Sequence, residues 1–130
     1  MEYEHDEIGY NYRMPNLNAA LLVAQLENLE SFLADKRALA EEYSKFFNTM
    51  DDIDFIKEPS DSKSNYWLNV INVEKRDESL KVLNENGIMS RPVWKLLSEL
   101  EIYKECQSDE LSNSRYLESR LINIPSGVRL

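Results

Sequence analysis

Apolar residues recur at helical spacing over residues 16–50. The recurring positions are Leu17, Leu21, Leu22, Leu26, Leu29, Leu33, Leu39, Tyr43, Phe46 and Met50. The spacing predicts one long helix, which begins with Pro15 in its first turn or with Asn16 as its N-cap. Because this length is about three times that of a mean helix of about 11–12 residues, we expect a bend or a break, or a protrusion that meets a second subunit.

The pattern changes after residue 50 to short strands and short helices. Alternating aromatic and β-branched residues over 65–73 predict the clearest strand, and Phe55-Ile56 is long enough only for an edge strand. Further strands are predicted at 88–93 and 122–124, and helices at 77–86 (ended by Gly87), 96–103 and 110–120. This order predicts an α+β fold, in which a long N-terminal helix leads into a short sheet with helices on one side.

Composition and charge exclude several classes of function. The chain has 130 residues, the size of one domain, and a formal net charge of -9. We expect no nucleic-acid partner, since neutralising phosphates needs clustered Lys and Arg, and no membrane span, since no apolar run approaches about 18 residues. The single cysteine, Cys106, rules out an internal disulfide and suits a reducing cytoplasm. His5 lies among acidic residues that we interpret as solvated, so we expect no metal site.

A polar loop over residues 9–16 directly precedes the long helix. Amide, phenol and guanidinium groups stand within these eight positions, a density that suits an anion. The loop lies against a helix N-terminus, where free N–H groups and the helix dipole favour a phosphate or a carboxylate. Many helices begin with polar residues and bind nothing, so a purely structural loop is the alternative.

Three blocks of the sequence resemble one family. GYNYRMPNLNAALLVAQLE, residues 9–27, is similar to a signature of the DegT/DnrJ/EryC1/StrS family of pyridoxal-phosphate-dependent sugar aminotransferases. Residues 87–97 resemble the same family's small domain, closest to the branch acting on UDP-linked 4-keto-6-deoxy-N-acetyl sugars, and residues 121–127 resemble its near-terminal strand and turn. The resemblance implies the C-terminal small domain of a fold-type-I transferase over residues 16–130, preceded by a segment, 1–15, that carries a phosphate-contacting loop.

The resemblance also implies a cofactor site shared between two subunits. In the family, the asparagine of this loop reaches the phosphate of pyridoxal 5'-phosphate in the partner subunit of a homodimer, and Asn11 matches it. Arg13 would add a charged, bidentate contact, and Tyr12 would contact sugar, position the loop or pack in the core. The Schiff-base lysine is expected in a large domain N-terminal to this chain, so we assign no catalytic residue here and expect the chain alone to be inactive and to expose apolar surface.

Arg91 and Trp94 are the second pair of candidates. Pro92 stiffens the segment between them, an arginine suits a diphosphate, and an indole can stack on a sugar or a base. The alternatives are a surface ion pair for Arg91 and a core position for Trp94. As substrates, the resemblance implies a nucleotide sugar and an amino donor such as glutamate.

Two other functions remain open at this point. A sugar dehydratase of the same family has histidine in place of the lysine, at a position outside this sequence. A non-catalytic dimerisation or interaction domain would use the long helix alone.

Overall fold

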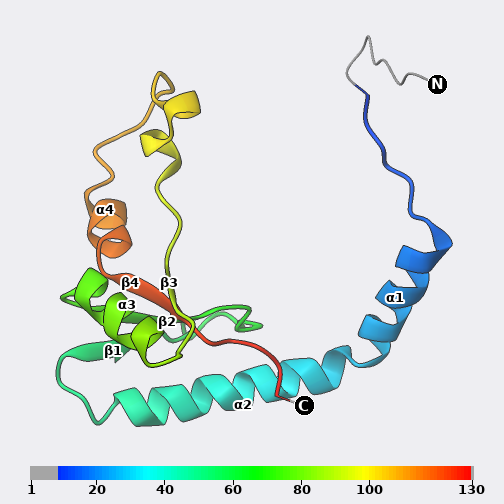
Figure 1. The fold of residues 1–130 in the computed structure, drawn as a ribbon, viewed down its shortest axis with the longest axis horizontal. Helices are drawn as coiled ribbons and strands as arrows, with labels where there is room; N and C mark the ends of the chain where they lie inside the picture. The colour runs from blue at the N-terminus through cyan, green and yellow to red at the C-terminus, as the bar shows by residue number, and fades with distance from the viewer. Residues whose placement is uncertain (1–8, 130) are drawn as a thin grey trace. The chain divides into compact units, whose positions relative to one another are not determined.

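The computed structural model describes residues 9–129, and the chain divides into two compact units, residues 1–31 and 32–130. Each unit is described by itself. The predicted N-terminal part of the segment, residues 1–8 with His5, lies outside the described residues. The helices are α1 (Asn16–Glu27), α2 (Leu29–Phe47), α3 (Arg76–Glu85) and α4 (Ser112–Glu118), with two short 3₁₀ helices at Leu97–Glu99 and Glu101–Tyr103 (Figure 1). Among the described residues, no helix is both long enough and apolar enough to cross a membrane.

The long helical pattern is broken, as predicted, and the break lies at Asn28. Its backbone leaves the helical region (φ -103°, ψ 2°), and its side-chain Nδ2 donates to the carbonyl of Ala24 at 2.8 Å. Both predictions for the helix start are wrong. Pro15 precedes the helix with extended backbone, and Asn16 is already its first helical residue. The second helix ends at Phe47, three residues before the predicted end.

The sheet is antiparallel, with strand order β1-β2-β4-β3. Its strands are β1 (Ile53–Phe55), β2 (Asn69–Val73), β3 (Arg91–Pro92) and β4 (Leu121–Ile124). The two central strands alternate strictly between buried and half-buried side chains. Ile71 is opposite Ile122 across them, and Phe55 is opposite Ile71, so the apolar side chains form rows on one face.

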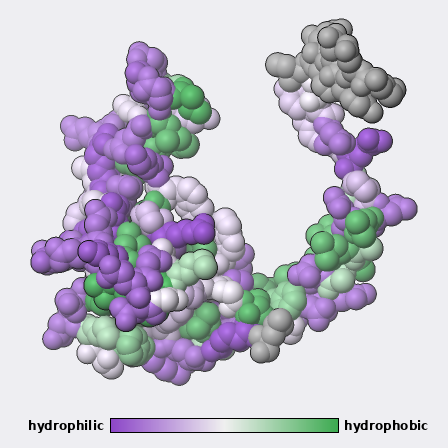
Figure 2. Space-filling view, viewed as in Figure 1, coloured by the Kyte–Doolittle hydropathy of each residue, from purple (hydrophilic) through white to green (hydrophobic). Residues whose placement is uncertain are grey.

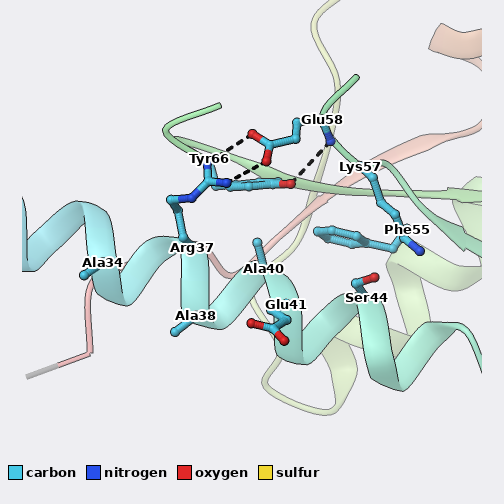
Figure 3. A pocket seen from close by; sticks show the side chains of 10 residues that line it. All are labelled: Ala34, Arg37, Ala38, Ala40, Glu41, Ser44, Phe55, Lys57, Glu58 and Tyr66. Carbon is cyan, nitrogen blue, oxygen red and sulfur yellow. Dashed lines mark hydrogen bonds and ion pairs between the residues drawn. The ribbon is translucent and has the colours of Figure 1, made fainter. Parts of the chain in front are cut away.

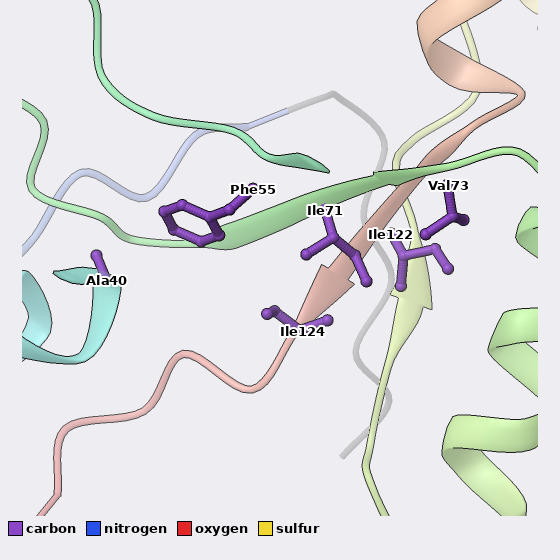
Figure 4. Packing of buried hydrophobic residues seen from close by; sticks show 6 residues of the cluster. All are labelled: Ala40, Phe55, Ile71, Val73, Ile122 and Ile124. Atoms are coloured by element: carbon purple, nitrogen blue, oxygen red, sulfur yellow. The ribbon is translucent and has the colours of Figure 1, made fainter. Parts of the chain in front are cut away.

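One apolar cluster holds the second unit together (Figure 4). Its buried members are Ala40, Phe55, Ile71, Val73, Ile122 and Ile124. Tyr43 and Phe47 from α2, and Leu80 and Leu83 from α3, pack against this cluster. Helices therefore cover one face of the sheet, and the predicted α+β architecture is confirmed.

Several predicted elements are shorter than expected. Residues 65–68 are not part of β2, because Tyr66 adopts a left-handed backbone (φ 46°) that a strand does not allow. The strand predicted over 88–93 is reduced to Arg91–Pro92, where the proline at the sheet edge lacks an N–H to donate. The helix predicted over 96–103 is two 3₁₀ helices, separated by Leu100 with extended backbone.

The C-terminal segment is fastened to α2 by polar contacts. The Arg129 guanidinium binds Asp35 at 3.0 Å and both carboxylate oxygens of Glu42 at 2.8–2.9 Å. The Tyr43 hydroxyl donates to the carbonyl of Pro125 at 3.1 Å. Arg129 lowers the pKa of Asp35, chiefly through a backbone hydrogen bond, and the two carboxylates raise the pKa of Arg129. These contacts fix the segment that follows β4.

We predict that Ile122→Ala lowers the free energy of unfolding by about 2–5 kcal/mol, because removing the fully buried side chain leaves a cavity in the apolar cluster on the covered face of the sheet. Ile102→Ala is the matched control, since that side chain is 77% exposed and should change stability by less than about 0.5 kcal/mol. Urea unfolding of both variants measures this, and equal losses would contradict the position of the core.

We also predict that Gly87→Ala lowers the free energy of unfolding by about 1 kcal/mol. Gly87 ends α3 with φ 77°, and the N–H groups of Gly87 and Ile88 donate to the carbonyls of Asn84 and Leu83. Nothing lies within 4 Å of an added methyl group, so the expected cost is one of backbone conformation. Gly127→Ala, equally open but without a positive φ, should leave thermal and urea unfolding unchanged.

Candidate functional site

The loop over residues 9–15 presents free hydrogen-bond donors. It has no regular structure, and the Asn11 side-chain Oδ1 accepts a hydrogen bond from the backbone N–H of Arg13 at 3.1 Å. That contact leaves the Asn11 amide N–H groups and the Arg13 guanidinium without partners among residues 9–129. The rings of Tyr10 and Tyr12 stack at 6.0 Å, and Tyr12 is 90% exposed, so the core position considered for Tyr12 is wrong.

The start of α1 adds to this donor surface. No side chain caps its first turn, so the N–H groups of that turn that are not used within the helix lie next to the loop in sequence. Within the first unit, Asn11 and Arg13 therefore stand in a loop that leads directly into an uncapped helix N-terminus. A set made only of donors suits a bound phosphate.

Helix α1 exposes apolar side chains, and Figure 2 shows hydrophobic surface over this helix on the face in view. None of its residues is buried. The exposed apolar side chains are Leu17, Leu21, Leu22, Val23 and Leu26. The expected apolar surface is thus present, and a helix that is apolar all round is typical of one covered by other protein.

Arg91 and Trp94 lie in the second unit, at and just after the edge strand β3. Trp94 is 69% exposed, so it does not belong to the core. Arg91 is exposed and forms no side-chain hydrogen bond or ion pair with any described residue, which excludes the surface ion pair within this part of the chain.

Trp67 is a candidate that the sequence does not indicate. The alternating pattern over residues 65–73 predicts a strand there, whereas in the structure the exposed Trp67 ring lies 6.1 Å from the ring of Trp94. No local signal marks this pairing, because it joins the β1–β2 connection to the segment after β3.

An open groove of about 560 Å³ lies between α2 and the segment from β1 to Tyr66 (Figure 3). Its lining residues are Ala34, Arg37, Ala38, Ala40, Glu41, Ser44, Phe55, Lys57, Glu58 and Tyr66. At its end the Arg37 guanidinium binds Glu58 through two hydrogen bonds of 2.6 and 3.0 Å, and the backbone N–H of Ser64 donates to the same carboxylate. Because Arg37 and Glu58 neutralise each other, neither offers a free charge to a ligand in the groove. Their contact instead holds the β1–β2 connection against α2.

The pKa of Glu58 follows from these contacts. The Arg37 side chain, and then the Ser64 N–H, lower the pKa of Glu58 from its ordinary value of 4.5 to about 2. The hydrogen bonds to the Glu58 carboxylate in turn raise the pKa of Arg37. No group of three or more His, Cys, Asp or Glu side chains among the described residues is placed to hold a metal ion.

Comparison with known proteins places these sites in context. The family model described as the DegT/DnrJ/EryC1/StrS aminotransferase family matches residues 1–130. The GDP-perosamine synthase of Escherichia coli O157:H7 is 36% identical over 129 residues, which cover 96% of this chain and 34% of that protein. The chain thus spans about a third of the length of the curated relatives it matches, at their C-terminal end.

Solved structures share the fold. A DegT DnrJ EryC1 StrS aminotransferase from Brucella abortus superposes with a TM-score of 0.84 at 26% identity, covering 100% of this chain and 35% of that chain. An E. coli GDP-4-keto-6-deoxy-D-mannose-3-dehydratase with bound hydrated PLP gives a TM-score of 0.78 at 22% identity, covering 93% of this chain and 33% of that chain.

We predict that Glu58→Gln reduces the dependence of stability on acid pH. Because its folded pKa is depressed, the Glu58 carboxylate adds stability above about pH 4.5, and this contribution is lost as the pH falls towards 2. The variant should be less stable at pH 7, and its stability should fall less between pH 4.5 and 2. Urea unfolding across this range checks it, with Glu85→Gln, an exposed carboxylate 3.9 Å from Lys81, as control. If the free energy of unfolding had the same pH dependence in wild type and Glu58→Gln, the lowered pKa of Glu58 would be refuted.

Proposed function

Since the chain belongs to the DegT/DnrJ/EryC1/StrS aminotransferase family, we propose that it forms the C-terminal part of an enzyme that aminates a nucleotide-linked 4-keto sugar. Relatives in this family depend on pyridoxal phosphate. The amino donor is a small amino acid such as glutamate, and the enzyme works in the cytoplasm as a homodimer. The lysine that links the cofactor lies outside this chain, so the chain by itself is inactive and contributes binding groups.

The observation that carries the proposal is the set of free donors in the loop over residues 9–15. When bound, pyridoxal phosphate supplies an electron sink for the carbanion that transamination requires. The phosphate of that cofactor is a dense anion, and the Asn11 amide and the Arg13 guanidinium have N–H groups available to donate to it. The hydrogen bond from the Arg13 backbone N–H to Asn11 Oδ1 turns the amide so that its donors remain available.

The homodimer explains why these donors are exposed. The loop reaches the cofactor phosphate of the partner subunit, and the exposed apolar side chains of α1 are covered in the assembled enzyme.

Three exposed residues are assigned to substrate contacts. Tyr12 from the loop contacts the sugar, the Arg91 guanidinium binds the diphosphate, and the Trp94 indole stacks on the sugar or the base. The name of a relative at 36% identity indicates a GDP-linked product, whereas residues 87–97 resemble the UDP-linked branch.

A dehydratase is the second candidate, favoured by the dehydratase structure that shares this fold. The two activities differ at the residue beside the cofactor, lysine or histidine, which lies outside this chain. A third candidate, a non-catalytic interaction domain, would need the apolar surface of α1 but not the donors of the loop.

We predict that Asn11→Ala in the full-length protein weakens pyridoxal phosphate binding about 2- to 12-fold, the effect of losing one hydrogen bond of about 0.5–1.5 kcal/mol. Arg13→Met should weaken it further, because a charged donor is removed. Equilibrium dialysis gives the dissociation constants. Asn18→Ala, two residues into α1, is the control and should bind as wild type; an Asn11→Ala variant with undiminished affinity would contradict the phosphate role.

A further inference from the structure

The two tryptophans of the chain, Trp67 and Trp94, form an exposed pair in the second unit. Their exposed fractions are 66% and 69%, and their rings lie 6.1 Å apart with an interplanar angle of 30°. Water disfavours so large an apolar surface, and every aromatic face in the pair is suited to stacking. An inserted ring would need about 7 Å, twice the carbon contact distance of about 3.5 Å, so a planar group stacks on an outer face of the pair.

Lys36 holds Trp67 in place from α2. Its half-buried ammonium group donates to the backbone carbonyls of Tyr66 and Trp67 at 3.3 Å and of Ser126 at 2.6 Å. These three acceptors match the three N–H donors of a lysine. The left-handed backbone of Tyr66 turns the chain at this point, and the N–H of Trp67 donates to the Asn65 side chain at 2.9 Å. The Trp67 indole is therefore presented by a backbone fixed on both sides.

The charge near the pair points to the kind of group that it binds. Arg91 lies three residues before Trp94, is exposed, and has no ionic partner among residues 9–129. In a chain of net charge -9, a guanidinium that has no ionic partner in the described part of the chain and stands three residues before one ring of an aromatic pair suits a ligand with both an anionic and a planar part. A nucleoside diphosphate has these two parts.

We propose that Trp67 and Trp94 together form the stacking surface for the nucleobase of the nucleotide sugar, and that Lys36 is the positioning residue that keeps Trp67 in it. The proposal rests on the proposed function, from which the nucleotide sugar is taken. Trp67 thus joins Trp94 as a second aromatic residue of the site, and a contact from Lys36 of α2 fixes the position of Trp67.

The test compares ligands with and without a base. Dissociation constants for GDP, UDP and inorganic pyrophosphate are measured by calorimetry on the full-length protein and on Trp67→Ala and Trp67→Phe. Trp67→Ala should weaken GDP and UDP binding by about 5- to 150-fold, the range of one base–aromatic stack. Pyrophosphate affinity should not change, and Trp67→Phe, which keeps a ring, should retain most of the affinity. Affinities for GDP and UDP that are unchanged in Trp67→Ala, or binding of neither nucleotide by wild type, would overturn the proposal.

Lys36 is tested separately. Lys36→Met should reduce the near-ultraviolet circular dichroism of the indole pair and weaken GDP binding, while Lys45→Met, on the same helix and paired only with Glu41 among the described residues, should do neither. Unchanged dichroism and affinity in Lys36→Met would refute the positioning role.

If Trp67→Ala altered only the sedimentation of the dimer, the pair would be a subunit contact and the proposal would be wrong. The pyridoxal phosphate affinity of Asn11→Ala is a separate measurement. The phosphate role of the loop and the stacking role of the indole pair can therefore be confirmed or refuted independently of each other.

Discussion

The second unit depends on burying one face of a narrow antiparallel sheet. Only two strands, β2 and β4, are paired on both sides, and they supply Ile71, Val73, Ile122 and Ile124 to the same face. With so small a core, the register of these two strands is decisive, since a shift by one residue would direct Asn72 and Asn123 inward. The positions of α2 and α3 follow, because both helices bury their apolar residues on this face.

Polar contacts from α2 organise what the core does not reach. Arg37 holds the β1–β2 connection through Glu58, Lys36 holds its end through the Tyr66 and Trp67 carbonyls, and Asp35 and Glu42 hold Arg129. These contacts are spaced along one helix, so one rigid element fixes both loop and C-terminal segment. Individually, exposed ion pairs contribute little to stability. Here they mainly fix the positions of the β1–β2 connection and of the C-terminal segment relative to α2. The exposed indole pair includes Trp67, whose backbone carbonyl accepts one of these contacts from Lys36.

The first unit follows a different logic. Its helix buries none of its residues, and the Asn11 amide N–H groups and the Arg13 guanidinium of its loop have no partner among residues 9–129. Apolar helices of this kind are stabilised by tertiary contacts more than by helix propensity. The chain belongs to a family of pyridoxal-phosphate enzymes and spans about a third of the length of its relatives.

Local patterns in the sequence determined the α+β class, the edge position of β1, the end of α3 at Gly87 and the family. Each depends on residues close together in the chain, where periodicity and backbone preference act directly. The length of the helical pattern indicated a break without its position at Asn28. The tertiary structure alone decided that residues 65–68 leave the strand, that Trp67 meets Trp94, and that Arg91 has no ionic partner in the described part of the chain. These features depend on contacts such as that of Lys36 with residues 66, 67 and 126, whose partners are distant in sequence and leave no periodic signal.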